Sequence, residues 1–379
     1  MTARARKSIS VYFHVPFCKS KCNYCSFASG VYPPDKISLY FELVQKDFSS
    51  FFSLLTEPYE VPTLYIGGGT PSSVPMEFLV NAVEYLYSLI PKKPYEITIE
   101  ANPGDVNPEF IKAIGQIGVN RISLGAQSFN DNVLEFLGRR HTVAQTVESY
   151  NLLRECGFSN INLDLIHGVP DFSFQRWRDD LSEAISLDPD HISLYALSVE
   201  EGTPFYEHRV GDRLDHDADA LEYDLAVKTL RDTGYHRYEI SNFSLPGKEC
   251  RHNINYWRMG EYVGFGPSAA SHGNDTYVEN VSDPDTYMNL IEKGLPAVEN
   301  MEKFTGRDRW VNALIMGMRL DEGIEIDTFN RRYDVNLVDE VTKVWKTYLK
   351  ENYVILDKNI LRFGDKAVYV SNSLLSMLM

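Results

Sequence analysis

The amino-acid sequence predicts an α/β fold, in which six strand-then-helix units are followed by a smaller and mostly helical C-terminal region. Over the first two thirds of the chain, short runs of β-branched and aromatic residues alternate with longer segments of helical periodicity. No hairpin signal separates neighbouring strands, which indicates parallel strands joined by helical crossovers. After about Tyr238 the alternation ends. An open doubly wound sheet and a (β/α) barrel, whole or partial, both fit this pattern.

The elements follow from these two periods in chain order. Strands are expected over residues 8–14, 63–66, 96–100, 121–127, 160–166 and 191–197. Amphipathic segments behind them predict helices over residues 35–55, 76–89, 108–117, 130–137, 143–156, 174–187 and 217–232. Residues 241–275 are rich in Gly, Pro, Asn and aromatic residues, and helices over 307–320 and 336–351, strands over 353–356 and 361–363 and a helical tail follow. We therefore expect two domains, residues 1–240 and residues 241–379.

Composition narrows the class of protein. The 379 residues are 44% hydrophobic and 24% charged, which is typical of a folded globular chain and excludes a largely disordered one. A net charge of −16 offers no general attraction to nucleic acid, so no nucleic-acid partner is expected. Five cysteines are an odd number, and no apolar signal segment follows the basic start of the chain. These features favour a reducing, cytoplasmic location.

Three of the five cysteines form one cluster. Cys18, Cys22 and Cys25 have the spacing CxxxCxxC, directly after the first expected strand. Three local thiolates can hold an iron–sulfur cube and leave one iron open to a further ligand. The alternatives are a zinc knuckle completed by Cys156 or Cys250, or three unrelated thiols. The spacing and position favour the iron–sulfur cluster.

Polar or glycine residues end several successive strands. Gly67, Gly68, Gly69 and Thr70 follow the second strand, and the next three strands end near Glu100, Gln127 and Asp164. A glycine run lets backbone N–H groups approach a ligand closely, although it also suits a tight turn. Because active sites of parallel barrels lie at the carboxyl ends of the strands, we expect these groups to face one ligand site.

The cysteine motif, with Tyr24 just before its last cysteine, resembles the radical S-adenosylmethionine (SAM) superfamily. This resemblance implies a partial (β/α)6 radical-SAM barrel, a 4Fe–4S cluster on Cys18, Cys22 and Cys25, and SAM bound to the open iron. It also implies that an electron donor reduces the cluster, which then cleaves SAM to methionine and a 5′-deoxyadenosyl radical.

The likeness narrows to the branch that contains oxygen-independent coproporphyrinogen III oxidase and covers nearly the whole chain. It rests on Tyr12 and on the runs 14–18, 67–72, 121–129, 137–139, 164–170 and 193–204. The residues that it implies as SAM contacts are Tyr12, Gly68, Gly69, Thr70 and Glu100, with Tyr24 beside the cluster. Gln127, Arg139 and Asp164 match positions for a second SAM, while Arg139 could instead cap a helix end.

Two departures point away from the oxidase itself. Phe27 stands where the oxidase has a further cysteine, and only about ten residues precede Tyr12 where the oxidase has a longer arm. His252, Tyr256 and Trp257 instead form an HNxxYW motif, the mark of the haem chaperone branch. The resemblance implies that His252 binds haem, with the two rings against the porphyrin, Arg251 and Arg258 near its propionates and Cys250 as an alternative axial ligand. The motif alone would favour a packed aromatic cluster around a hydrogen-bonded histidine.

The resemblance therefore implies a haem chaperone that carries a 4Fe–4S cluster, SAM and haem and delivers haem to an acceptor protein. An oxygen-independent coproporphyrinogen III oxidase of porphyrin biosynthesis is the alternative, and a radical SAM methyltransferase or haem-degrading enzyme is a third. No catalytic residue is assigned, and the question of enzyme activity stays open. The expectation also accommodates a homodimer and a membrane-associated acceptor.

Overall fold

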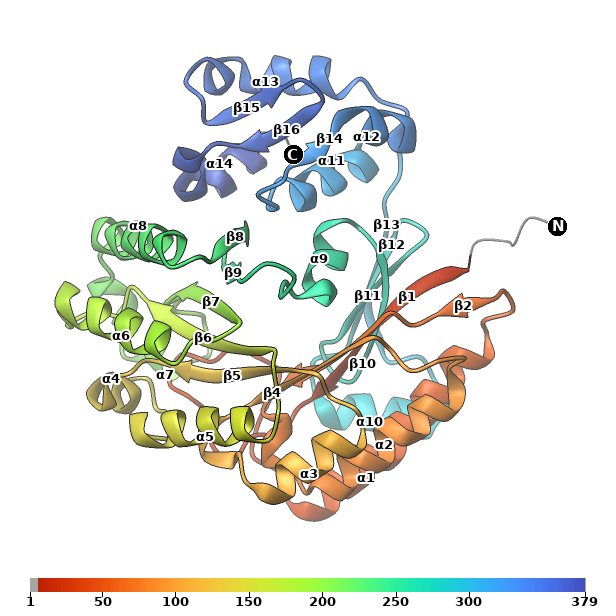
Figure 1. Cartoon of the computed structure of the whole chain (residues 1–379). Coiled ribbons are helices and arrows are strands. Elements are labelled where there is room, and N and C mark those ends of the chain that lie inside the picture. Colours follow the sequence, from red (N-terminus) through yellow and green to blue (C-terminus); the bar gives the residue numbers. More distant parts are fainter. Residues whose placement is uncertain (1–5, 379) are drawn as a thin grey trace.

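The structure, a computed structural model of the chain, describes residues 6–378 (Figure 1). Within these residues thirteen strands form one sheet, in the order β13-β12-β11-β10-β1-β3-β4-β5-β6-β7-β9-β8 with β2 paired to β1. Its parallel centre consists of β1 (Lys7–Val15), β3 (Thr63–Gly68), β4 (Glu96–Ala101), β5 (Arg121–Gln127), β6 (Ile161–His167) and β7 (His191–Ala196). The sheet runs from one edge strand to the other, so the barrel is partial, as expected.

Helices cover the outer face of the sheet between consecutive strands (Figure 1). They are α1 (Pro34–Ser53), α2 (Met76–Leu89), α3 (Pro108–Gln116), α4 (Asp131–Phe136), α5 (Val143–Glu155), α6 (Phe174–Ser186), α7 (Pro204–Glu207) and α8 (His216–Asp232). Helix α1 packs on α2, α2 on α3 and α6 on α8. Side-chain caps begin several of them, as at Asn107, Ser173 and Asp215. The six predicted strand-then-helix units are all present, and the predicted α/β fold class is confirmed.

Further strands that the sequence pattern did not predict extend both edges of the sheet. On one side are β9 (Asn242–Ser244) and β8 (His236–Glu239), and on the other β10 (Glu261–Phe265), β11 (Ala270–Gly273), β12 (Thr276–Asn280) and β13 (Val298–Lys303). β2 (Tyr59–Glu60) pairs with β1, which also pairs in parallel with β10. Helices α9 (Arg251–Trp257) and α10 (Pro284–Glu292) lie among these strands. Most are short, and β13 is exposed along its length, so their apolar alternation is weak.

The chain from Gly306 onward forms a small module above the sheet (blue in Figure 1). It contains α11 (Gly306–Gly317), α12 (Ile326–Tyr333), α13 (Leu337–Lys350), α14 (Ser371–Ser376) and a three-stranded sheet of β14 (Ile324–Glu325), β16 (Ile360–Phe363) and β15 (Val354–Asp357). Leu314, Leu337, Val341, Trp345 and Leu361 are fully buried in its own core. The expected helices and strands of this region are therefore present, while a domain division at residue 240 stays a prediction.

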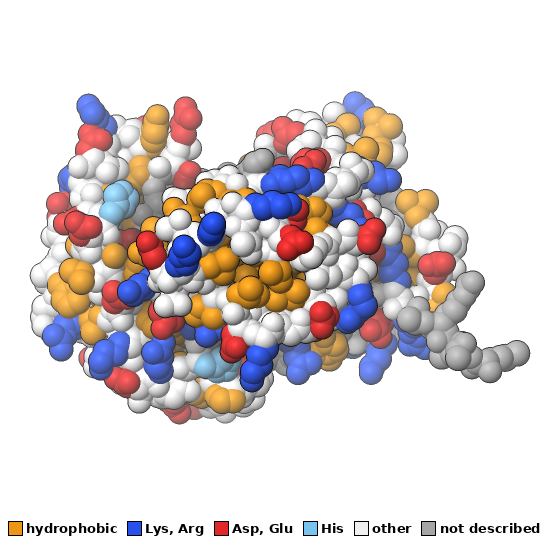
Figure 2. Space-filling model, turned by 90° about the horizontal axis from the view of Figure 1, so that it is seen from above, with side chains coloured by type: hydrophobic (Ala, Val, Ile, Leu, Met, Phe, Trp, Pro, Cys, Tyr) orange, Lys and Arg blue, Asp and Glu red, His pale blue; other side chains and the backbone are white. Residues whose placement is uncertain are grey.

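The surface mixes charges of both signs despite the acidic composition. Figure 2 shows Lys and Arg side chains interspersed with Asp and Glu over the face on the side of the C-terminal module, with hydrophobic side chains gathered near its centre. None of the helices described in residues 6–378 is both long and apolar enough to cross a membrane.

Candidate functional site

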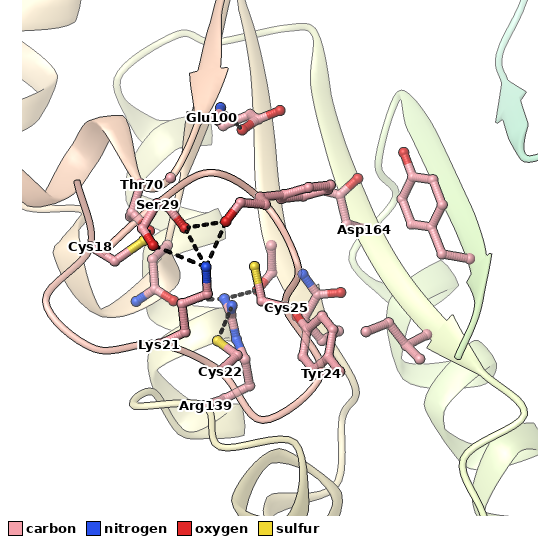
Figure 3. A pocket seen from close by; sticks show the side chains of 18 of the residues that line it. Cys18, Lys21, Cys22, Tyr24, Cys25, Ser29, Thr70, Glu100, Arg139 and Asp164 are labelled. Carbon is pink, nitrogen blue, oxygen red and sulfur yellow. Dashed lines mark hydrogen bonds between the residues drawn. The ribbon is translucent and has the colours of Figure 1, made fainter. Parts of the chain in front are cut away.

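A pocket of about 360 Å³ lies at the carboxyl edge of the parallel strands, between the strand ends and the cysteine loop (Figure 3). The sequence-predicted residues that line it are Cys18, Cys22, Tyr24, Cys25, Gly68, Gly69, Thr70, Glu100, Gln127, Arg139 and Asp164. The structure therefore brings together all the predicted site residues except Tyr12 and His252. The parallel register explains this, because it places equivalent ends of β3, β4, β5 and β6 along one edge.

The cysteine loop connects β1 to α1 and is held in place by backbone and lysine hydrogen bonds. The N–H of Cys18 donates to Gly30 O at 2.8 Å, and the N–H of Asn23 donates to Leu137 O at 3.0 Å. Inside the loop, Lys21 Nζ donates to the carbonyls of Phe27 at 2.6 Å and Ser29 at 2.9 Å (Figure 3). These bonds fold the loop over the strand ends.

Arg139 joins this loop to the sheet. Its Nη1 donates to Cys22 Sγ at 3.4 Å, and its Nη2 donates to Asn102 Oδ1 at 2.7 Å and to Gly125 O at 2.9 Å (Figure 3). A guanidinium beside a thiolate stabilises its negative charge. In this structure Arg139 therefore holds the cysteine loop against β5 and the loop after β4.

The glycine run after β3 is required by its surroundings. A Cβ on Gly67 would lie 2.8 Å from the carboxyl group of Glu100, and one on Gly69 would lie 2.7 Å from Phe17 O. Gly68 has φ +112, and a Cβ there would lie 2.5 Å from the ring of His14. The run therefore forms a tightly packed cradle, in which a side chain at any of the three positions would overlap the protein's own atoms.

Two carboxyl groups face the pocket, Glu100 from β4 and Asp164 from β6, the strands on either side of β5. Tyr65 donates to Glu100 Oε1 at 2.9 Å, and the Gly68 N–H donates to Glu100 Oε2 at 3.0 Å. Burial, with a further contribution from Asp164, raises the pKa of Glu100 to about 7. Asp164 accepts from Ser123 at 3.1 Å and from Asn162 at 2.8 Å, and burial raises its pKa as well. A cationic ligand would favour the ionised form of both groups.

Gln127 reaches the same pocket through an irregularity in β5. The register of β5 against β6 shifts between Leu124 and Gln127, and Gln127 has φ 67, in the left-handed region. A non-glycine residue in this conformation stores strain, and such strain concentrates at functional sites.

The donor set fits an iron–sulfur cube better than a single metal ion. Cys18, Cys22 and Cys25 are free thiols that line one pocket. Within residues 6–378, no three His, Cys, Asp or Glu side chains converge closely enough to hold one ion. In a 4Fe–4S cube each thiolate binds a different iron, so the three sulfurs need not converge. Burial raises the pKa of the Cys25 thiol, and a bound cation would lower it because it favours the thiolate.

Comparison with known proteins shows the family to which the chain belongs. Residues 12–184 match the Radical SAM superfamily, and residues 304–370 match the HemN C-terminal domain. The Heme chaperone HemW of Bacillus subtilis is 32% identical over 371 residues, which cover 96% of this chain and 95% of its own. The chain belongs to the HemW family.

Further relatives support the same membership. The Heme chaperone HemW of Escherichia coli is 37% identical over 278 residues, which cover 71% of each chain. The structure of coproporphyrinogen III oxidase (HemN) from Escherichia coli superposes with a TM-score of 0.87 at 21% identity, covering 99% of this chain and 91% of that one. That likeness shows the shared fold, so the fold of this HemW-family chain is the one its sequence predicts.

The two predicted residues outside the pocket lining differ in their surroundings. Tyr12 lies on β1, where its hydroxyl is hydrogen-bonded to His14 Nδ1 at 3.0 Å. His252 lies on α9, at the amino ends of β3 and β4, and is 1% exposed. Its Nδ1 is hydrogen-bonded to Thr63 at 2.7 Å and its Nε2 to Tyr256 at 2.7 Å.

These bonds indicate the form of the His252 ring. The Thr63 hydroxyl donates to Ser10, so it accepts from Nδ1–H, which leaves Nε2 to accept from the Tyr256 hydroxyl. Burial lowers the pKa of His252 to about 3, consistent with a neutral ring. The arrangement is the packed, hydrogen-bonded cluster that the motif alone favoured.

Several residues of the pocket were not predicted from the sequence. Lys21, Tyr65, Asn102, Ser123 and Tyr195 also line it. Tyr65 and Ser123 lie on strands in which polar and apolar residues alternate, which was an available signal for inward-facing polar groups. Lys21 bonds within its own loop, whereas Asn102 accepts from Arg139, 37 residues away, a contact for which the local sequence carries no signal.

Proposed function

We propose that this chain is a radical-SAM-type haem chaperone, which holds a 4Fe–4S cluster and SAM in its barrel, binds haem, and transfers haem to an acceptor protein. One observation carries the proposal: three cysteines and four strand ends meet in one pocket, in a chain that matches Heme chaperone HemW relatives over nearly its full length. A cytoplasmic location stays a prediction from the cysteine usage.

Cys18, Cys22 and Cys25 would hold the cluster, which supplies one-electron chemistry when an electron donor reduces it. Glu100 and the backbone of Gly68 and Gly69 would hold the methionine end of SAM. Gln127 and Asp164, which line the same pocket, would contact a second SAM. Arg139 would stabilise the Cys22 thiolate and keep the loop closed over the strand ends. Tyr24 would exclude water from the cluster.

The haem side of the proposal rests on the relatives' printed name and on the HNxxYW motif. The role proposed for His252 requires its Nε2 to exchange the Tyr256 hydroxyl for iron. No proton has to leave the ring in this exchange, because a neutral imidazole with its proton on Nδ1 is the form that ligates haem iron.

The cluster is tested by anaerobic reconstitution of the full-length protein, with iron and acid-labile sulfide measured after gel filtration. Cys22→Ala should lose most of both, because two thiolates do not retain the cube. Cys156→Ala is the matched control, since Cys156 is exposed at the end of α5 and should leave the cluster intact. Equal iron contents in the two variants would contradict the assignment.

Haem carriage is separated from oxidase activity by two measurements on the cluster-loaded protein. Haem titration followed by Soret absorbance should show saturable binding, and the bound haem should pass to an apo-acceptor protein. Coproporphyrinogen III incubated with SAM and a reductant should remain unchanged. Formation of protoporphyrinogen would instead establish the oxidase alternative.

A further inference from the structure

Arg139 places a positive charge beside the cysteine loop, and no carboxylate balances this charge. Its guanidinium contacts Cys22 Sγ and the oxygens of Asn102 and Gly125 (Figure 3). In the part of the chain that the structure describes, no Asp or Glu oxygen lies within 4.0 Å of its nitrogens. A charge taken out of water is costly unless an anion faces it. The anion that Arg139 contacts is the cysteine sulfur, once that sulfur is a thiolate.

Two hydrogen-bond donors at the same place have no acceptor. Arg139 Nε and Asn102 Nδ2 are both buried, and neither has a partner among residues 6–378. Both residues line the pocket together with the three cysteines. Because buried donors are seldom left unpaired, unpaired donors at a pocket indicate a ligand that carries acceptor atoms. The sulfides and thiolates of an iron–sulfur cube are acceptors of this kind.

A further donor reaches the first cysteine of the motif. Thr70 Oγ1 and Cys18 Sγ are hydrogen-bonded at 3.5 Å. A thiolate that binds iron has no proton, so the Thr70 hydroxyl is then the donor. Side-chain donors therefore contact the sulfurs of two of the three cysteines, one from the loop after β3 and one from Arg139, which is bonded to β5.

These donors are held in position by bonds that do not involve the cysteines. Nη2 of Arg139 donates to Asn102 Oδ1 at 2.7 Å and to Gly125 O at 2.9 Å. Asn102 is buried, and its N–H donates to Ser72 Oγ at 3.0 Å. A donor that is fixed in advance stabilises a new negative charge without having to reorganise.

We infer that Arg139, Asn102 and Thr70 raise the reduction potential of the cluster that the three cysteines would hold. The inference rests on the proposed function, because it requires that cluster. Reduction by one electron adds a negative charge to the cluster and its thiolates, and hydrogen bonds or a positive charge at the sulfurs stabilise the reduced form. The resemblance to the oxidase implies a different role for Arg139, as a contact of a second SAM. The potential and SAM binding distinguish the two roles when they are measured separately.

The test is a redox titration of the reconstituted full-length protein without SAM, with dithionite as the reductant and the EPR signal of the reduced cluster as the readout. Arg139→Gln should lower the ratio of reduced to oxidised cluster at a given potential about tenfold, which is about 59 mV in the midpoint of a one-electron couple. Arg139→Lys keeps the charge and should recover most of this loss. Arg140→Gln is the matched control, because Arg140 is the neighbouring arginine, pairs with Asp105 at 2.9 Å and does not line the pocket.

Thr70→Val is a second variant, which keeps the inference testable where Arg139→Gln does not retain the cluster. It removes the hydroxyl with little change in side-chain volume, and it should lower the midpoint by a smaller amount than Arg139→Gln. Iron and acid-labile sulfide are measured in every variant, so that potentials are compared between proteins with equal cluster content.

The outcomes separate this inference from the function on which it rests. A lowered midpoint in Arg139→Gln, with values near the wild type in Arg139→Lys and Arg140→Gln, supports it. A wild-type midpoint in cluster-loaded Arg139→Gln overturns it, and a loss of bound SAM in the same variant would make Arg139 a SAM contact instead. An equal shift in Arg140→Gln also overturns it. Where Arg139→Gln loses its iron, a lowered midpoint in Thr70→Val supports the inference and an unchanged one overturns it. A wild type that retains neither iron nor sulfide would overturn the proposed cluster itself.

Discussion

The two edges of the parallel sheet use similar residues in opposite ways. At the carboxyl edge, Glu100 and Asp164 keep part of their hydrogen-bonding capacity facing a cavity. At the amino edge, Glu96 accepts the N–H groups of Arg251 at 3.0 Å and His252 at 2.9 Å, at the start of α9. A carboxylate there satisfies the first turn of a helix. The same side-chain chemistry thus serves a ligand at one edge and the fold at the other.

The difference shows that residue type alone does not identify a site. His252 and Glu100 are both inward-facing ionisable groups whose pKa is shifted by burial. Only Glu100 lines a pocket, whereas His252 has both ring nitrogens satisfied by side chains. Free hydrogen-bonding capacity toward a cavity is therefore the better criterion for a ligand contact.

The largest predicted effect concerns the backbone at the carboxyl edge. Gly68→Ala should destabilise the protein by about 2–4 kcal/mol, because φ +112 is strained for alanine and its Cβ would meet the His14 ring at 2.5 Å. Urea unfolding of the full-length protein measures the change. Gly247→Ala is the control, since Gly247 has φ +80 but no atom within 4 Å of a Cβ, and should cost about 1 kcal/mol. Equal losses would show that the cradle is not tightly packed.

The next effect tests whether the amino edge is structural. His252→Ala should lower the free energy of unfolding by about 2–3 kcal/mol, because it leaves the Tyr256 hydroxyl unpaired, removes the hydrogen bond to Thr63 and opens a cavity beside Tyr65. Tyr256→Phe removes only one of the two hydrogen bonds and should cost about 1 kcal/mol. Urea unfolding of haem-free protein is the measurement. A His252→Ala variant as stable as the wild type would place His252 outside the packing network and favour a ligand role.

How far the sequence predicted the site differs between the two edges for a physical reason. The carboxyl-edge residues were predictable, because alternating strands and helices give parallel strands, and the carboxyl ends of parallel strands lie along one edge. The contact of His252 with Thr63 joins positions 189 residues apart, and that of Arg139 with Cys22 joins positions 117 apart. Such contacts depend on how α9 and the cysteine loop pack on the sheet, which local periodicity does not encode. The short edge strands β10 to β13 were missed because their alternation is too weak to detect.

The smallest predicted effect is a pH dependence at Glu100. Its pKa is raised in the folded protein, from 4.5 to about 7, so the stability that it contributes is fully present below about pH 4.5 and is lost as the pH rises through 7. Because the carboxyl group opens onto the pocket, we expect about 1–2 kcal/mol of this loss rather than the full shift. Glu100→Gln has no titrating proton, and it can still accept from the Gly68 N–H while its amide group donates to the Tyr65 hydroxyl. It should flatten the stability profile between about pH 4.5 and 7 by that amount.

The pH dependence of stability that Glu100 causes also distinguishes the two edges, because a bound cationic ligand should remove it. SAM would favour the carboxylate and lower its pKa, so the wild-type profile should flatten when SAM is added to the cluster-loaded protein. Asp105→Asn is the control, since Asp105 is buried and paired with Lys19 and Arg140 outside the pocket. SAM should flatten the pH profile of stability of this variant as much as it flattens that of the wild type. A wild-type profile that SAM leaves unchanged would remove Glu100 from the ligand contacts and reduce the carboxyl edge, like the amino edge, to a structural role.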